Sequence, residues 1–169
     1  PHIVHGARMG KKFGELKMQD YVQVGLTDAI LGKMTGELAE MLAAKYNIDR
    51  AAQDKFALAS HHKAVSAQQN GAFADEMVPL PELDRDEHPR GDTSLEKLAS
   101  LKPAFNGTIT AGNASGINDG AAMVLICDED TAQKHSWQPL AYLNAAADIG
   151  VDPAYFGIGP AMVMRKLAA

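Results

Sequence analysis

The pattern of apolar and polar positions changes after the first 34 residues of the chain. Residues 1–20 show no sustained periodicity, which predicts a loop or a short irregular extension. Residues 35–48 then adopt helical spacing, with Leu38, Met41 and Leu42 on one apolar stripe. Thr35 stands before this stripe and is the predicted N-cap, because its hydroxyl can accept a hydrogen bond from the first turn. A short helix is therefore expected here.

A longer helix is predicted over residues 50–69. Asp49 precedes it as an N-cap, and Asn70 with Gly71 follows it, since glycine readily takes the left-handed conformation that ends many helices. Its apolar residues lie on more than one face, so we expect the helix to be packed on two sides. These residues are Ala51, Leu58 and Val65 on one stripe and Ala52, Phe56 and Ala59 on another.

In the second half of the chain, short predicted helices alternate with predicted strands and loops. Residues 79–92 are charged and rich in proline, which predicts an exposed connection. Thr93 and Glu96 then predict a capping box for a brief helix that Pro103 ends. Strands are predicted over 107–112, 121–128 and 140–151, and short helices over 129–136 and 161–169, the last one after Gly159 and Pro160. This order predicts an α/β chain, in which a mainly helical excursion precedes pieces of layered sheet.

Composition narrows the class of protein. The length of 169 residues allows one domain or two small ones, and a net charge of -5 argues against a generally basic surface for nucleic acid. The single Cys127 excludes an internal disulfide and favours a reducing compartment. The sequence has neither an apolar run approaching the roughly 18 residues of a membrane span nor a signal-peptide pattern, so the expected location is cytoplasmic. Because the chain opens with Pro1 and stops within a helical pattern, we expect it to be a section of a longer polypeptide.

The stretch GTITAGNASGINDGAA, residues 107–122, is the main candidate for chemistry. It is poor in bulk and carries one charge, Asp119. Small residues let a backbone approach a ligand closely, and Asn113, Ser115 and Asn118 add hydrogen-bonding groups, which would suit a long, thin ligand that bears amides. A phosphate-binding turn is a competing interpretation, although the lysine of the Walker pattern and the dinucleotide spacing are missing. A purely structural role in a tight turn also remains open.

Other chemically interesting residues have ordinary structural explanations. Cys127 is expected to be buried in an apolar strand and unreactive. His61 and His62 point about 100 degrees apart on a helix, so they cannot share one metal ion and are expected to be a solvated pair. His2 and His5 lack further ligands for a metal. A solvated charged run is expected at Asp84, Asp86 and Glu87, and packing roles at Met162 and Met164. No metal site is predicted.

The stretch 107–122 closely resembles the signature of the thiolase family, whose members form or cleave the β-keto bond of acyl-CoA thioesters. Residues 25–79 resemble the helical insertion of that family, and LASLKPAF and VDPAYFGIGP follow at the expected separations. The resemblance implies a thiolase-like α/β fold, with a mainly helical loop domain followed by parts of layered αβαβα sheets. The implied divisions are a CoA-binding loop domain over 1–116, the end of the N-terminal half over 117–138, and the start of the C-terminal half over 139–169.

The resemblance also implies roles for individual residues. Ser115 and Ala111 match positions that contact the pantetheine arm of CoA, and Gly116 belongs to the same CoA-binding set. Apolar positions that line the pantetheine tunnel correspond to Leu26, Phe105 and Ile117. Arg90 matches a basic position beside the adenosine phosphate. Phe156 stands where many members have a methionine facing the acyl pocket. Met34 and Thr35 stand where short-chain members have a His-Met pair. This difference leaves the preferred length of the acyl chain open.

By the same resemblance, the full-length protein is expected to be an acetyl-CoA acetyltransferase, with acetyl-CoA or acyl-CoA as substrate and no separate cofactor. The two cysteines, the histidine and the asparagine of the family's reaction lie in motifs that this chain lacks, so no catalytic residue is predicted within it and the chain alone is expected to be inactive. A homodimer or homotetramer is expected, without nucleic-acid or membrane partners. Two alternatives stay open: a non-catalytic CoA-binding or oligomerisation module, and a degradative 3-ketoacyl-CoA thiolase that prefers longer chains.

Overall fold

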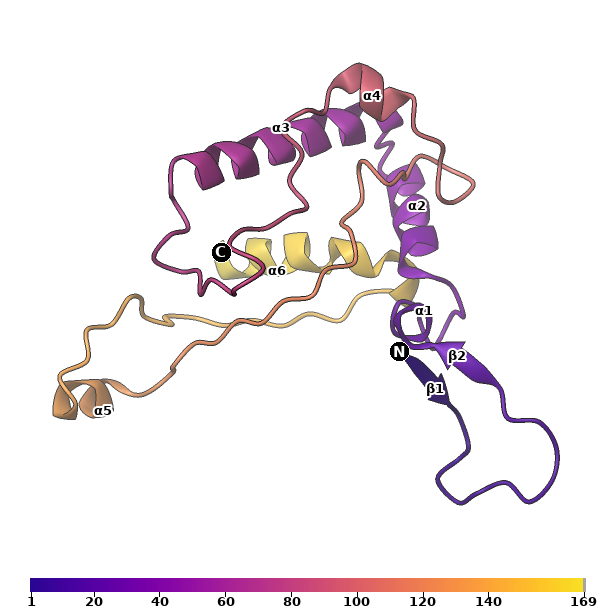
Figure 1. The fold of residues 1–169 in the computed structure, drawn as a ribbon, viewed down its shortest axis with the longest axis horizontal. Helices are drawn as coiled ribbons and strands as arrows, with labels where there is room; N and C mark the ends of the chain where they lie inside the picture. Colours follow the sequence, from indigo (N-terminus) through magenta and orange to yellow (C-terminus); the bar gives the residue numbers. More distant parts are fainter. Residues whose placement is uncertain (169) are drawn as a thin grey trace.

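The computed structural model describes residues 1–168. The chain begins with a two-stranded antiparallel sheet, β1 (His2–Val4) and β2 (Met18–Asp20), in which His2 pairs with Asp20 and Val4 with Met18. Residues 5–17 join the two strands and project from the molecule (Figure 1). The sequence predicted only an irregular extension here, because three-residue strands are too short to produce a visible alternation.

The helices of the first half begin where hydrogen-bond acceptors are available to the first turn. Asp20 accepts a hydrogen bond from Gln23 N at 2.9 Å and caps α1 (Tyr21–Gly25). The next helix, α2 (Thr35–Lys45), starts one residue before the predicted position, with Met34 as the N-cap. The prediction of Thr35 as the cap was wrong because Glu37, in the first turn, accepts a hydrogen bond from Met34 N at 2.8 Å.

The long helix α3 (Arg50–Gln69) has the predicted bounds, and both of its predicted ends are confirmed. Asp49 accepts a hydrogen bond from Ala52 N at 2.8 Å, and Gly71 follows the helix at φ 68°. Packing on two sides was a wrong expectation, since the Phe56 side chain is 78% exposed. Among the described residues, α3 packs mainly against α4 (Leu95–Ala99), so its other face has no helix or strand to cover it.

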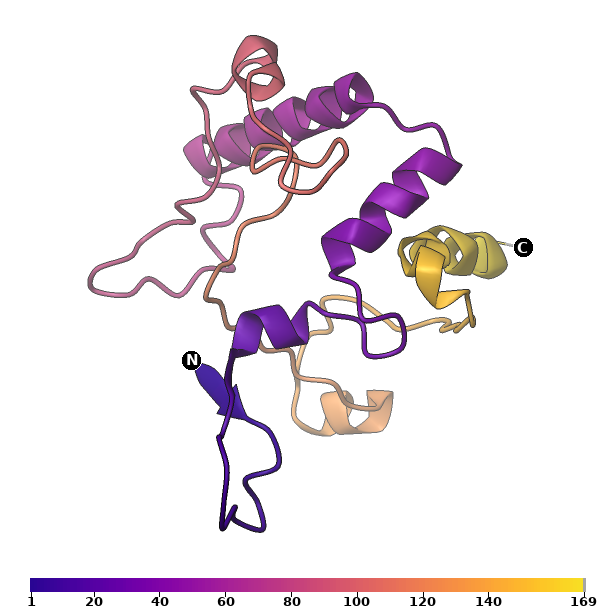
Figure 2. The same ribbon diagram turned by 90° about the vertical axis from the view of Figure 1, so that its right-hand side faces the viewer.

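The predicted later helices are formed, one of them with a different cap, together with a 3-10 helix that the sequence did not predict. Ser94, and not Thr93, caps α4 by accepting a hydrogen bond from Lys97 N at 3.2 Å. Further along the chain lie α5 (Glu129–Lys134), the 3-10 helix η1 (Pro153–Ile158) and α6 (Gly159–Ala168), and η1 packs against α2. The exposed connection over 79–92 is also confirmed. Figure 2 shows α3 and α4 together at one end of the molecule and the β1–β2 hairpin at the other.

The three strands predicted in the second half are not formed. Residues 107–112 make a turn, with one isolated bridge between Pro103 and Thr110, and neither 121–128 nor 140–151 contains a strand. These two segments lead to α5 and away from it in an extended course (Figure 1), and their apolar residues are exposed, with Met123 at 96% and Leu140 at 104%. A strand requires a neighbour for its backbone hydrogen bonds, and within residues 1–168 no segment pairs with them.

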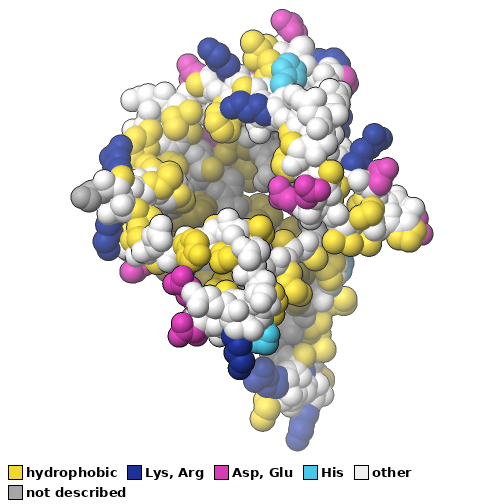
Figure 3. Space-filling view, turned by 90° about the vertical axis from the view of Figure 1, so that its left-hand side faces the viewer, with side chains coloured by type: hydrophobic (Ala, Val, Ile, Leu, Met, Phe, Trp, Pro, Cys, Tyr) yellow, Lys and Arg dark blue, Asp and Glu magenta, His cyan; other side chains and the backbone are white. Residues whose placement is uncertain are grey.

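The buried interior of the described chain is correspondingly small. Leu38 of α2, Leu98 of α4 and Ala132 of α5 are its buried apolar residues. Seen from the side of α5, the molecule is hollowed near its centre, with hydrophobic side chains around the hollow (Figure 3). Asp54, Leu98 and Thr110 are buried where α3, α4 and residues 107–114 meet, which is also where the candidate site lies.

Candidate ligand-binding site

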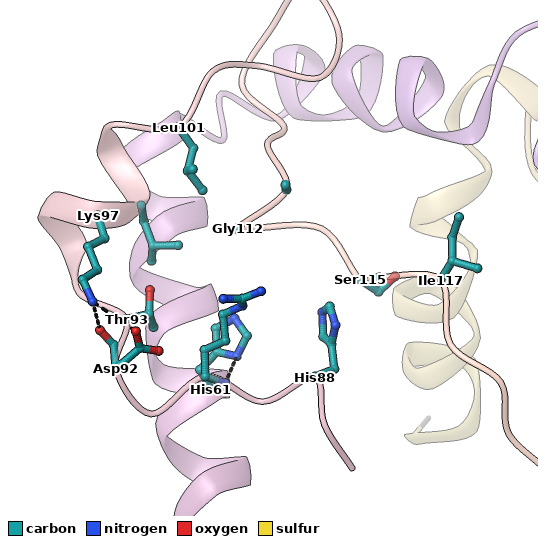
Figure 4. Close-up of a pocket in the computed structure, with 13 residues that line it drawn as sticks. His61, His88, Asp92, Thr93, Lys97, Leu101, Gly112, Ser115 and Ile117 are labelled. Carbon is teal, nitrogen blue, oxygen red and sulfur yellow. Dashed lines mark hydrogen bonds and ion pairs between the residues drawn. The ribbon is translucent and has the colours of Figure 1, made fainter.

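A cavity of about 560 Å³ lies between the middle of α3, α4 and the small-residue loop 111–117 (Figure 4). Its lining comes from three parts of the chain that are distant in sequence. They are His61 on α3; His88, Arg90, Asp92, Thr93, Lys97, Leu98 and Leu101 on and around α4; and Ala111, Gly112, Ser115, Gly116 and Ile117 on the loop.

A compact hydrogen-bonded turn shapes the start of the loop wall. Thr110 is fully buried, and its carbonyl accepts hydrogen bonds from Asn113 N at 3.2 Å and Ala114 N at 3.1 Å. In return, Thr110 N donates to Asn113 Oδ1 at 2.7 Å, while Gly112 N donates to Thr110 Oγ1 at 3.1 Å. Because these bonds fold residues 110–114 on themselves, the predicted strand over 107–112 could not form.

Glu40 of α2 holds the segment just before this turn. Its Oε1 accepts hydrogen bonds from Thr108 N and Ile109 N, each at 2.7 Å, and its Oε2 accepts one from Thr108 Oγ1 at 3.0 Å. Burial alone would raise the pKa of Glu40, but these three bonds favour the carboxylate and hold the pKa below its ordinary value. The site's loop is thus fastened to α2 by an ionised side chain.

Close approach of neighbouring segments explains why the loop is poor in bulk. A β-carbon added at Gly112 would lie 2.5 Å from Leu98 Cδ2 and 2.6 Å from Leu101 Cδ1, and one added at Gly116 would lie 2.4 Å from His88 Cε1. A larger residue at either position would force these side chains to shift. These close contacts support a structural role for the two glycines. The loop nevertheless leaves an open cavity beside Ser115.

The opposite wall of the cavity is polar. Arg90 N donates a hydrogen bond to His61 Nδ1 at 3.1 Å, and the rings of His61 and His88 lie 6.3 Å apart between centroids. Burial lowers the pKa of His61, and the nearby charges of His88 and Arg90 lower it further. The expectation of a solvated His61 was wrong because the 88–93 segment folds back onto α3 and half buries the ring.

The charged side chains of this wall are the cations Arg90 and Lys97 and the carboxylate Asp92. Lys97 Nζ pairs with Asp92 Oδ2 at 3.2 Å, and this hydrogen bond keeps the pKa of Asp92 below its ordinary value. Within residues 1–168, no hydrogen bond or ion pair engages the Arg90 guanidinium. The cavity therefore has a positive excess in a chain whose net charge is -5. An anionic group on a ligand would be attracted to this end.

Five of the seven residues predicted to bind CoA line this one cavity: Arg90, Ala111, Ser115, Gly116 and Ile117. The other two lie outside it. Leu26 follows α1 and is exposed, and Phe105 lines a second cavity of about 400 Å³ beside Glu37, Glu40 and Met41. Neither Met34, at the start of α2, nor Phe156, in η1, lines either cavity. Their predicted roles in acyl binding stay predictions.

The sequence interpretation missed several lining residues, among them His88, Asp92, Thr93 and Lys97. They belong to a charged, proline-rich stretch that is typical of an exposed connection. The only available signal was the charge change from the acidic run at 82–87 to Arg90 and Lys97. That change does not reveal which way the segment folds.

Two further expectations bear on chemistry elsewhere in the chain. Cys127 is exposed, not buried, because the strand that was expected to contain it is not formed. Across residues 1–168, no group of three or more His, Cys, Asp or Glu side chains is arranged to hold a metal ion. Over the same residues, no helix has the length and apolarity needed to cross a bilayer.

The cavity has cationic side chains on one wall and small residues on the other, in a largely helical chain with a two-stranded sheet. The family of the chain follows from comparison with known proteins. Residues 1–130 match the family described as Thiolase, N-terminal domain, and the chain belongs to the thiolase family.

Individual relatives agree with this assignment. The probable acetyl-CoA acyltransferase of Staphylococcus aureus strain N315 is 46% identical over 178 residues, covering 98% of this chain and 45% of that protein. The crystal structure of the Bacillus anthracis acetyl-CoA acetyltransferase superposes with a TM-score of 0.89 at 42% identity, over 98% of this chain and 45% of the other. The crystal structure of human mitochondrial 3-ketoacyl-CoA thiolase in complex with CoA superposes with a TM-score of 0.87 at 38% identity. This match covers 99% of this chain and 45% of the other.

These likenesses confirm the predicted thiolase-like α/β fold class. The chain spans about half the length of the relatives it matches. The predicted divisions at residues 116 and 138 stay predictions, since the family match over residues 1–130 does not divide the chain there.

Proposed function

We propose that this chain is the CoA-holding section of a thiolase, and that the full-length protein transfers acyl groups between CoA thioesters. The observation that carries the proposal is the convergence of Arg90 with the loop residues Ala111, Ser115, Gly116 and Ile117 on one cavity. By resemblance to the thiolase family, each of these residues belongs to the set that contacts CoA.

The two ends of the cavity match the two parts of CoA. Phosphates would lie towards Arg90 and Lys97, where charge-assisted hydrogen bonds are available. The pantetheine arm is thin and bears amides, so it would pass between the loop at Ser115 and the apolar side chains of Leu98 and Leu101. A relative of similar fold has been solved in complex with CoA, which supports this choice of ligand.

In the proposed reaction, two acetyl-CoA molecules give acetoacetyl-CoA and free CoA, or the reverse. One acetyl group is first held as a thioester on a cysteine of the full-length protein. The enolate of the second acetyl-CoA attacks that carbonyl, and the cysteine thiolate leaves. The part of this chain is to bind and orient the CoA arm, and no catalytic group is assigned to it. The proposal includes a cytoplasmic homo-oligomer without a further cofactor.

Acyl-chain length separates this proposal from its nearest alternative. Relatives include both an acetyl-CoA acetyltransferase and a 3-ketoacyl-CoA thiolase. Thiolysis by the purified full-length protein should be compared for acetoacetyl-CoA and for a 3-ketoacyl-CoA with a longer acyl chain, of about eight carbons. A higher kcat/KM for acetoacetyl-CoA supports the acetyltransferase assignment, and the reverse order supports the longer-chain alternative.

The site itself is tested by CoA binding, measured by calorimetry on the full-length protein. Arg90→Ala should raise the Kd for CoA about tenfold, because loss of a charge-assisted phosphate contact removes about 1.5 kcal/mol. Arg85→Ala is the matched control, since it removes the same charge from the same exposed segment without touching the cavity. Pantetheine, which lacks the phosphates beside Arg90, should bind both variants equally. Equal Kd values for CoA in the two variants would reject the phosphate assignment.

A further inference from the structure

The two walls of the cavity are both attached to the first turns of α3. Arg50 and Asp54 lie one helical turn apart on α3, and Arg50 Nε donates to Asp54 Oδ2 at 2.7 Å. Asp54 is buried, whereas the Arg50 side chain is 23% exposed, so the ion pair is buried on its carboxylate side. Neither residue lines the cavity.

Arg50 reaches the α4 wall through its remaining donors. Its guanidinium Nη2 donates to the carbonyl of Leu98, and also to the carbonyl of Leu101 at 3.2 Å. The side chains of these same two leucines line the cavity. One guanidinium therefore holds the end of α4 and the residues just after it against α3.

Asp54 reaches the loop wall through its second oxygen. Asp54 Oδ1 accepts a hydrogen bond from Asn113 Nδ2 at 3.0 Å. The same Asn113 amide group donates to Thr108 O at 3.1 Å, and its Oδ1 accepts from Thr110 N at 2.7 Å. Asn113 thus closes the turn that carries Ala111, Gly112 and Ser115 into the cavity. Asp54 therefore contacts the loop wall through Oδ1 and Asn113, and is linked to the α4 wall through Oδ2 and Arg50.

We propose that Arg50 and Asp54 are positioning residues that set the spacing between the α4 wall and the Ser115 loop, and thereby the affinity for the CoA arm. This inference rests on the proposed function of the cavity. A β-carbon built at Gly112 would lie 2.5 Å from Leu98 Cδ2 and 2.6 Å from Leu101 Cδ1, so the two walls are already close at this point. Loss of the pair lets them move apart, which weakens their contacts with a thin ligand.

Conservative substitutions distinguish an effect on the position of the cavity walls from an effect on the stability of the folded protein. Asp54→Asn keeps the size of the side chain but has one oxygen, so it cannot accept from both Arg50 and Asn113. Arg50→Lys keeps the charge but lacks the planar fork that reaches Asp54, Leu98 and Leu101 together. Asp49→Ala is the control, because it removes the N-cap of the same helix without touching either wall.

The experiment uses the full-length protein and measures the Kd for CoA, KM and kcat in thiolysis, and unfolding by urea. Asp54→Asn and Arg50→Lys should each raise the Kd and KM for CoA about tenfold, with kcat changed less than about twofold. Asp49→Ala should lower stability and leave the Kd unchanged. Unchanged Kd values in both wall variants, or an equal rise in the Asp49→Ala control, would overturn the inference.

A double-mutant cycle addresses the link between the walls and covers the case in which Asp54→Asn does not fold. The structure gives no hydrogen bond between Arg50 and Asn113; Asp54 lies between them. Arg50→Lys and Asn113→Ala should therefore be non-additive, with the double variant no weaker in CoA binding than the weaker single variant. Additive effects contradict the inference. If the unmodified protein binds no CoA, the proposed function itself fails, which is a distinct result.

Discussion

Gly112 and Leu98 meet across the narrow side of the cavity, so closely that a β-carbon at Gly112 would lie 2.5 Å from Leu98 Cδ2. Figure 4 shows Gly112 on the loop, opposite the segment that carries Leu101. This contact explains the absence of bulk at the centre of the signature stretch. It also makes the width of the passage sensitive to a single methyl group.

Gly112→Ala should therefore destabilise the protein by about 1–3 kcal/mol and weaken CoA binding, because the leucine side chains must move to admit the methyl group. Urea unfolding and calorimetry with CoA measure the two effects. Gly25→Ala is the matched control, since a β-carbon there meets nothing within 4 Å. Equal stability and CoA affinity in the two variants would show that the Gly112 contact does not limit the passage.

Glu40→Gln should destabilise the protein by about 1–2 kcal/mol, since a neutral amide accepts the Thr108 and Ile109 hydrogen bonds less strongly than a carboxylate does. The pKa of Glu40 is lowered in the folded protein, so this contribution is present above the ordinary pKa and is lost as pH falls through the lowered value. Unfolding measured from pH 7 down to about 3 should show the variant and the parent converging. A constant difference over this range would contradict the assignment.

The lowered pKa of His61 predicts a pH dependence of the same sign as that of Glu40, at higher pH. The unfolded chain binds a proton on this residue more readily than the folded protein does, so stability from His61 is complete above its ordinary pKa of 6.5 and declines as pH falls through the lowered value. His61→Gln should reduce the slope of stability against pH in this range. His62→Gln, at the adjacent exposed position, removes only the smallest of the charges that lower this pKa and should reduce the slope much less. Identical slopes in the two variants would count against the proton linkage.

The exposed apolar segments predict the behaviour of the isolated 169-residue chain. Met123, Val124, Leu125 and Ile126 are each at least 75% exposed, and Leu140 and Leu143 are similarly uncovered. Unpaired extended segments with apolar side chains promote association. The isolated chain should elute from size exclusion as oligomers or aggregates and should lack a sharp thermal transition. A monodisperse monomer with cooperative melting would be inconsistent with this structure.

The helices could be predicted from the sequence because their signals are local. Asp49, Gly71 and the apolar stripe of α2 each act within a few residues, and the structure confirms the bounds of α3. The strands could not be predicted in the same way. Apolar runs such as 121–127 show that a segment can pair, but pairing needs a neighbour, and residues 1–168 supply none.

The site was predictable only in part for a similar reason. The loop residues Ala111, Ser115 and Ile117 belong to one contiguous signature, so a resemblance locates all of them together. His61 and Arg90 are joined by a hydrogen bond across 29 positions, and no local pattern around either residue indicates that contact. The link from Arg50 through Asp54 to Asn113 spans still more of the chain. Long-range contacts of this kind become visible only in the folded structure.

The central claim is that the cavity beside Ser115 holds the arm of CoA, and a crystal structure of the full-length protein soaked with CoA tests it most directly. We expect electron density for pantetheine between the 111–117 loop and the side chains of Leu98 and Leu101, with a phosphate within hydrogen-bonding distance of Arg90. CoA bound at a different location, or this passage filled by side chains of the protein itself, would contradict the account.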